Sequence, residues 1–182
     1  MRSRAPVTTL SRVDAFLALV SRREVRDYDE RPLPEDAVRR ILEAGRLAGS
    51  SRNRQERRFI AVRDPGVRAA LAELVHTPAN VRGAALVIAV VTRGRGRTGI
   101  DAGRAAQNMM IAAWNEGIGS CPNGITNADA CRTALGAGEE EQVATLVSFG
   151  FPAHPRDPGR RSPEEWIARA DRRPFDEVVE FR

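Results

Sequence analysis

The sequence contains no lysine: all 29 of its basic residues are arginine, set against 24 acidic residues. Because a guanidinium stays protonated at every accessible pH, this bias gives a formal net charge of +5 and a high isoelectric point. There is only one tyrosine, and aromatic residues are not interleaved with the arginines as they are on a platform for stacking bases. The arginines are also spread among the acids along the chain. We therefore expect ordinary solvated faces and no nucleic-acid partner.

Cysteine and histidine are equally scarce, with two residues of each. Cys121 and Cys131 have no cysteine or histidine at metal-ligand spacing, so we expect buried thiols rather than a disulfide or a metal site. His76 and His154 stand apart from any nucleophile and receive no role. The longest apolar run, residues 84–91, is too short to cross a bilayer, and the amino terminus has no apolar signal segment. We expect a cytoplasmic protein with no membrane partner.

The length of 182 residues predicts a single domain, residues 1–182, large enough to bury a core. Helical and strand patterns alternate without regular βαβ units, which predicts an α+β fold. Asp101 is expected to cap a long helix that ends at Trp114, and residues 175–182 are predicted to form a β-prone tail. The other helices are predicted over 12–21, 34–49, 65–75 and 127–136 and from residue 163, and the strands over 59–62, 84–92, 118–122 and 143–149.

Two polar clusters in the first third of the chain carry the functional prediction: Arg22-Arg23-Glu24-Val25-Arg26 and Ser50-Ser51-Arg52-Asn53-Arg54-Gln55. Three guanidiniums within five residues repel one another, so they are stable together in solvent or around an anion. Hydroxyls and amides suit a sugar chain or the edge of a heteroaromatic ring. Together the clusters indicate a phosphorylated cofactor. The alternatives are an exposed helix end, where cations complement the helix dipole, and ordinary loop chemistry.

Further segments follow these clusters in an order that resembles a known family. They are Asp101-Ala102-Gly103-Arg104-Ala105-Ala106-Gln107-Asn108, Gly117-Ile118-Gly119-Ser120, Gly150-Phe151-Pro152 and Arg172-Arg173-Pro174. On these motifs the chain, from about residue 21 to residue 181, resembles the nitroreductase family of FMN-dependent oxidoreductases. The resemblance implies a central mixed β-sheet flanked by helices and an intertwined homodimer. It also makes the tail, residues 175–182, a candidate for exchange with the partner subunit.

The same resemblance assigns arginines to the cofactor FMN. Arg22 and Arg173 are expected to clamp the phosphate, with Arg172 and Arg23 in reserve, because a guanidinium pairs well with that anion. Arg26 is expected beside the N1/C2 carbonyl side of the flavin ring, where a fixed cation raises the reduction potential.

The remaining cofactor-binding residues are also carried over from the resemblance. The backbone around Gly119 and Ser120 is expected near the flavin N5, and Gln55 at the ring edge or the ribityl chain. Three residues are expected to reach the cofactor from the partner subunit, namely Ser50, Ser51 and Asn53.

The activity implied is a two-step hydride transfer from NAD(P)H, through the flavin, to an electron-poor small molecule such as a nitroaromatic or a quinone. No side chain is expected to act as a catalytic group, and no metal is expected, because the flavin carries the chemistry. Two alternatives share the motifs: a flavin-dependent dehalogenase or flavin-cleaving enzyme on the same fold, and a non-catalytic protein that binds or sequesters flavin.

The chain departs from the family pattern at several positions. Glu24 stands where the family usually has serine, and we expect its carboxylate to point away from the phosphate or to pair with Arg23 or Arg26. Glu56-Arg57 replaces Pro-Trp, and Gly49 replaces proline. The Arg-Gly stretch from Arg93 to Gly99 is the only segment available to cover the pocket, and its basic run from Arg93 to Arg97 is expected to be a surface loop.

Overall fold

The computed structural model describes residues 14–94 and 98–182, and the chain forms two compact units. We call residues 22–157 the sheet unit, and the described residues 14–21 together with 158–182 the terminal unit. Of the predicted surface loop from Arg93 to Arg97, Arg93 instead ends a strand, and residues 95–97 lie outside the described residues.

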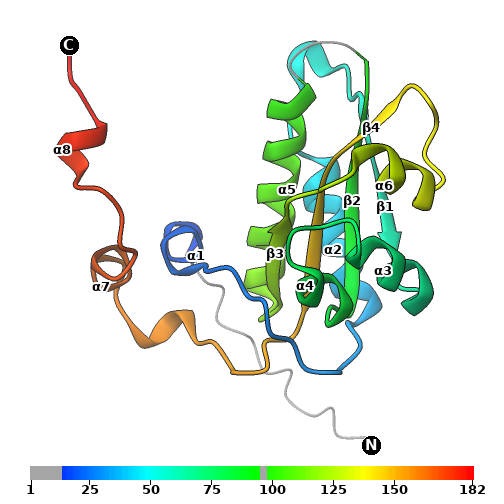
Figure 1. The fold of residues 1–182 in the computed structure, drawn as a ribbon. Helices are drawn as coiled ribbons and strands as arrows, with labels where there is room; N and C mark the ends of the chain where they lie inside the picture. Colours follow the sequence, from blue (N-terminus) through cyan, green and yellow to red (C-terminus); the bar gives the residue numbers. More distant parts are fainter. Residues whose placement is uncertain (1–13, 95–97) are drawn as a thin grey trace, which may run out of the picture. The chain divides into compact units, whose positions relative to one another are not determined.

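The sheet unit contains four strands in the order β1-β2-β4-β3, so β2 and β4 are central (Figure 1). All three strand pairings are antiparallel. The α+β fold is confirmed, whereas the expected mixed sheet is wrong for the described residues, because every pair of neighbouring strands is antiparallel. Strands β2 and β3, which are consecutive in the chain, run in the same direction but are separated by β4. The strands are β1 (Arg57–Val62), β2 (Leu86–Arg93), β3 (Gly119–Asn123) and β4 (Glu141–Gly150).

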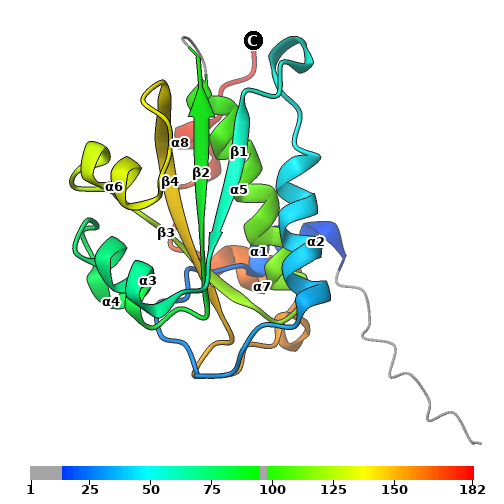
Figure 2. The same cartoon turned by 90° about the vertical axis from the view of Figure 1, so that its right-hand side faces the viewer.

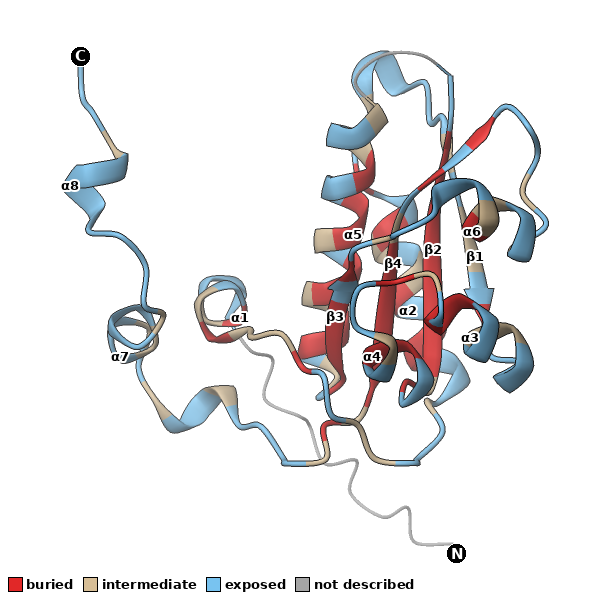
Figure 3. Cartoon of the chain, viewed as in Figure 1, coloured by how far each residue is buried: buried red, intermediate tan, exposed pale blue. Residues whose placement is uncertain are grey.

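Helices cover both faces of this sheet, and Figure 2 shows the layers edge on. Helices α2 (Glu35–Arg46) and α5 (Thr98–Asn115) lie on one face. Three shorter helices lie on the other: α3 (Pro65–Ala72), α4 (Pro78–Arg82) and α6 (Ala128–Ala134). Strand β2 alternates between the layers, as its period of two requires: Leu86, Ile88 and Val90 join the first core, and Val87, Ala89 and Val91 the second. It is buried on both faces, as predicted (Figure 3).

The terminal unit contains α1 (Ala15–Ser21), the 3-10 turn η2 (Pro158–Arg160), α7 (Pro163–Ala168) and α8 (Phe175–Val178). Its helices are locally well specified: Asp14 accepts a hydrogen bond from the Phe16 amide at 2.8 Å, and Ser162 with Glu165 forms a capping box. Among its described residues only Ala18 and Ser21 are buried. Large apolar side chains are exposed instead, namely Phe16, Leu19, Ile167, Phe175, Val178 and Phe181.

Two expectations about individual elements are wrong. Helix α5 begins at Thr98, so Asp101 lies in its first turn rather than at its cap, and its carboxylate accepts a hydrogen bond from the Ser51 amide at 3.3 Å. The tail forms a helical turn at Phe175–Val178 because acidic residues follow Pro174 in the first turn and complement the helix dipole. Within the described residues, no helix combines the length and the apolar character that crossing a membrane requires.

Candidate functional site

The segment from Arg22 to Tyr28 runs extended beside the start of β3. The Val25 amide donates to the Ser120 carbonyl at 3.0 Å, and a Cβ added at Gly119 would meet the Val25 side chain at 2.6 Å. A Cβ added at Gly150 would likewise meet the Tyr28 ring at 2.7 Å. Both close approaches require glycine. The structure therefore brings together two of the predicted site segments, the arginines of this segment and Gly119–Ser120.

The Arg22 side chain is largely buried and forms an ion pair with Glu24, with Nη2 of Arg22 2.9 Å from Oε1 of Glu24. Glu24 thus pairs with the arginine predicted to hold the phosphate, which corrects the expectation that it pairs with Arg23 or Arg26. The reason is local: in an extended segment, residues two positions apart share one side. Nη1 of Arg22 and Oε2 of Glu24 are buried and have no hydrogen-bond partner in the described structure.

A buried polar network supports this segment from behind. The Tyr28 hydroxyl lies 3.0 Å from Oγ of Ser148, which also receives a hydrogen bond from Nδ2 of Asn123 at 3.3 Å. Nδ2 of Asn80 in turn donates to Oδ1 of Asn123 at 3.2 Å. Burial of Tyr28 is the main reason that its pKa lies above the ordinary value. Sequence reasoning missed this network; its signal was the presence of amide and hydroxyl side chains within otherwise apolar runs.

The second polar cluster forms a strained loop that contains the 3-10 turn η1 (Ser51–Asn53). Three of its non-glycine residues are left-handed: φ is 52° at Arg52, 55° at Asn53 and 55° at Gln55. Such conformations are costly for residues other than glycine and asparagine, and they cluster at functional sites. Oγ of Ser50 accepts a hydrogen bond from the Gln55 amide at 2.9 Å and closes the loop. The side chains from residue 51 to residue 55 are exposed.

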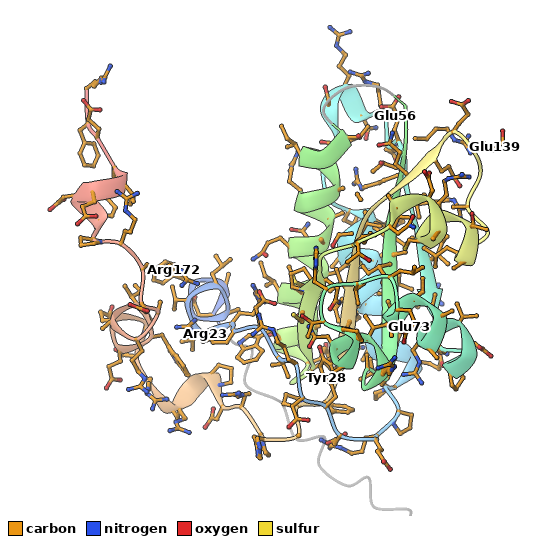
Figure 4. All side chains as sticks on the ribbon, viewed as in Figure 1. Arg23, Tyr28, Glu56, Glu73, Glu139 and Arg172 are labelled. Atoms are coloured by element: carbon orange, nitrogen blue, oxygen red, sulfur yellow. The ribbon has the colours of Figure 1, made fainter. Side chains whose placement is uncertain are left out.

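The two polar clusters lie at opposite ends of the sheet within one chain. Ser120, beside the arginine segment, pairs with Phe149, which pairs with Leu86 at the start of β2. Arg57, at the end of the strained loop, pairs with Thr92, six residues further along β2. At about 3.3 Å per residue the separation is about 20 Å. Figure 4 shows the same arrangement, with Tyr28 and Glu56 toward opposite ends of the strands. One chain therefore does not bring Arg22–Arg26 and Ser50–Gln55 together.

Arg172 and Arg173 belong to the terminal unit and make local contacts there. Nη1 of Arg172 donates to the Ala170 carbonyl at 2.8 Å, and Nε of Arg173 lies 3.3 Å from Oε2 of Glu177. Arg173 is 69% exposed, so its pair with Glu177 is readily exchanged for another anion. Their role beside the phosphate stays a prediction.

Two hollows mark the sheet unit elsewhere. One, of about 930 Å³, lies between α2 and β1, with Leu42, Phe59 and Ala61 in its lining. Since β1 is an edge strand, this hollow adjoins the open edge of the sheet. The other, of about 230 Å³, lies beside Gln55 and Glu141. Gln55 is the only predicted site residue that lines either hollow.

The two cysteines lie in the sheet unit and agree with the prediction. Cys121 and Cys131 are both free and buried, as expected. Burial raises the pKa of Cys121, the nearby Glu24 raises it further, and Arg26 lowers it. Burial alone raises the pKa of Cys131 to about 11. Both residues are therefore packed thiols rather than thiolates at neutral pH.

The fold and this geometry define an α+β protein whose antiparallel sheet lies between two helical layers, with a candidate anion site beside the start of β3. The family model described as Nitroreductase family matches residues 19–94 and 79–151. The chain belongs to the nitroreductase family.

Individual relatives extend over most of the chain. An NADH dehydrogenase from Thermus thermophilus is 28% identical over 198 residues, which covers 87% of this chain and 97% of the relative. An NADPH-dependent oxidoreductase from Staphylococcus aureus is 26% identical, covering 85% of this chain and 67% of the relative. A solved structure of a protein assigned as a nitroreductase, in complex with FMN, comes from Desulfovibrio desulfuricans. It matches with a TM-score of 0.78 and 29% identity, over 92% of this chain and 96% of that one.

Proposed function

We propose that this protein is an FMN-dependent oxidoreductase that passes hydride from NAD(P)H to an electron-poor small molecule, acting as a cytoplasmic homodimer. The observation that carries the proposal is the arginine segment fixed beside Gly119–Ser120 in a chain of the nitroreductase family. The relatives support it, because one is solved with FMN and another is NADPH-dependent.

The residues of this segment fit a flavin phosphate. Nη1 of Arg22 is a buried donor without an acceptor among the described residues, and an anion would satisfy it. Arg23, Arg172 and Arg173 are the further candidates for the phosphate, and Arg26 is the cation proposed for the ring. Bound FMN would supply the hydride relay between donor and acceptor.

The side chains of the protein itself then bind, orient and exclude water. Gly119 lets the arginine segment lie close against β3, because Val25 fills the space where a Cβ would lie. Ser120 is held by its carbonyl to the arginine segment. Ser50, Ser51, Asn53 and Gln55 are the proposed contacts from the partner. No side chain is assigned a catalytic role.

A homodimer accounts for the separation of the clusters. About 20 Å of sheet lies between them in one chain, whereas in the proposed dimer a twofold axis would place one cluster of each subunit against the other cluster of its partner. The exposed apolar side chains of the terminal unit and the open edge of β1 are further surfaces that a partner would cover. We propose one nitroreductase-like domain over residues 1–182, with residues 175–182 exchanged between subunits.

The visible absorption spectrum tests this function directly. The purified protein is expected to be yellow, and to bleach when NADH or NADPH is added without air. Donor consumption is then measured with a nitroaromatic, a quinone and a halogenated phenol, which separates reductase from dehalogenase chemistry. A yellow protein that neither donor bleaches favours the flavin-sequestering alternative. A colourless protein that takes up no added FMN contradicts the proposal.

A further inference from the structure

The residue that faces the proposed phosphate-binding arginine is an acid of the same segment. Nη2 of Arg22 lies 2.9 Å from Oε1 of Glu24, and the two side chains are only 14% and 31% exposed. The ion pair is therefore shielded from much of the solvent that weakens surface pairs. Any anion that binds Arg22 meets this carboxylate.

The pair is incomplete as it stands. A guanidinium and a carboxylate can form two parallel hydrogen bonds, but only one is made here. Nη1 of Arg22 and Oε2 of Glu24 are left buried without hydrogen-bond partners in the described residues. A buried unpaired donor and acceptor are costly, so the pair is not the arrangement that best satisfies either side chain. Nη1 of Arg22 is therefore available to donate a hydrogen bond to a second acceptor.

The surroundings keep Glu24 in place. Val25 is tied to Ser120 through its amide and is packed against Gly119, so the backbone of the segment cannot move freely. The side chains of Glu24 and Arg26 both lie close enough to the Cys121 thiol to interact with it. Glu24 is thus in contact with Arg22 and also within range of the Cys121 thiol.

We propose that Glu24 determines the flavin specificity of this protein, because it competes with the flavin phosphate for Arg22. The inference rests on the proposed function, since it concerns the same site. A dianionic phosphate has to displace the carboxylate or bind beside it, and both reduce the gain from the arginine. Riboflavin, which has the same ring and sugar chain but no phosphate, does not meet this opposition. The wild-type protein is therefore expected to prefer FMN over riboflavin by less than the same site would without this carboxylate.

The test compares these two ligands. The full-length protein is freed of flavin, and the quenching of flavin fluorescence is titrated with FMN and with riboflavin. Glu24→Gln removes the charge and keeps the shape, and we expect it to tighten FMN binding at least about tenfold, the value of one charge-assisted hydrogen bond. Riboflavin binding is expected to stay within about twofold, since no phosphate is present. Glu24→Ser is the second variant if the glutamine substitution disturbs the fold.

Two controls assign the effect to the ion pair. In an Arg22→Ala background, Glu24→Gln is expected to change the ratio of the two affinities less than it does in wild type, because competition for the arginine is removed and only repulsion from the phosphate remains. Asp29→Asn removes the carboxylate of the ion pair Asp29–Arg31, which has the same sequence spacing as Arg22 and Glu24. In that pair Oδ2 of Asp29 lies 2.6 Å from Nη2 of Arg31. The Asp29→Asn substitution is expected to leave the ratio unchanged in the wild-type background.

The outcomes distinguish a failure of the role proposed for Glu24 from a failure of the proposed function. If FMN binds and the ratio is the same in wild type, Glu24→Gln and Glu24→Ser, the role of Glu24 is refuted and the proposed function stands. If neither flavin binds the wild type or the variants, the proposed function fails, and the inference fails with it.

Discussion

Flavin binding by mixed dimers offers a direct check on how the site is assembled. One population of chains carries Arg22→Ala, and another carries Ser51→Ala with Asn53→Gly. Glycine is chosen at Asn53 because φ is 55° there, and alanine would add backbone strain to the loss of the side chain. Each population alone has a lesion in every site. A mixed dimer has one site with both lesions and one site with none, if each site takes one cluster from each chain.

The expected magnitudes follow from the contacts. Loss of Arg22 removes charge-assisted hydrogen bonds of about 1.5–3 kcal/mol, which weakens binding about 10–150-fold. Loss of two neutral hydrogen bonds at Ser51 and Asn53 removes about 1–3 kcal/mol. With random pairing, half of the dimers are mixed and each has one intact site of two, so about a quarter of wild-type sites return.

The assay is flavin fluorescence quenching at a free FMN concentration between the dissociation constants of wild type and variants. The chains are unfolded and refolded together, or expressed together, and compared with each population treated alone. A matched control mixes Arg22→Ala with Arg26→Ala chains, whose lesions lie in the same cluster, so no intact site forms. No recovery in the first mixture, with mixed dimers demonstrated by a tag on one chain, would refute the two-chain site.

Four further expectations concern single features. Gly119→Ala is expected to lower the free energy of unfolding in urea by about 1–3 kcal/mol, because the added Cβ overlaps a buried valine. Gly103→Ala, which adds a Cβ in open space on α5, should raise it by about 0.5–1 kcal/mol, and equal effects of the two substitutions would contradict this reasoning. Glu141 is held by its arginine partner at a pKa of about 2, below its ordinary value of 4.5, so the unfolded chain binds its proton first as the pH falls. Stability is therefore expected to decline between about pH 5 and pH 2, and Glu141→Gln should flatten that decline in denaturant midpoints. Arg173→Ala is expected to weaken FMN binding by about 2–3 kcal/mol if the guanidinium bonds the phosphate, and unchanged affinity would remove it from the site. Deletion of residues 175–182 should shift the protein toward monomer in gel filtration and release flavin; a deleted dimer that stays yellow would count against exchange of the tail.

Much of the fold was predictable because its signals are local. Asp64 caps α3 by accepting from the Val67 amide at 2.8 Å, and Asn127 caps α6 by accepting from the Ala130 amide at 3.0 Å, as their residue types favour. The prediction that Asp101 caps α5 was wrong for a physical reason: its carboxylate accepts a hydrogen bond from a residue 50 positions away, which no local pattern reveals.

The site was predictable in part. The proximity of the arginine segment to Gly119–Ser120 agrees with the order of the family motifs. The pairing of Glu24 with Arg22 followed from extended spacing, once the segment was known to be extended rather than helical. The polar network behind it was not predictable, because Tyr28 and Ser148 are 120 residues apart and meet only when β3 and β4 pair.

The strained loop supports the proposal that its residues contact a partner rather than their own chain. Left-handed conformations at Arg52 and Gln55 cost about 1–3 kcal/mol each, and local propensity would not choose them. They are maintained by two hydrogen bonds: the Gln55 amide donates to Oγ of Ser50, and the Ser51 amide donates to the Asp101 carboxylate. The arrangement directs the Asn53 side chain into solvent, where it stabilises nothing in its own sheet unit. Because the arginine segment of the same chain is about 20 Å away, this strain supports the same proposal as the sheet register, namely that the loop serves a site completed by a second chain.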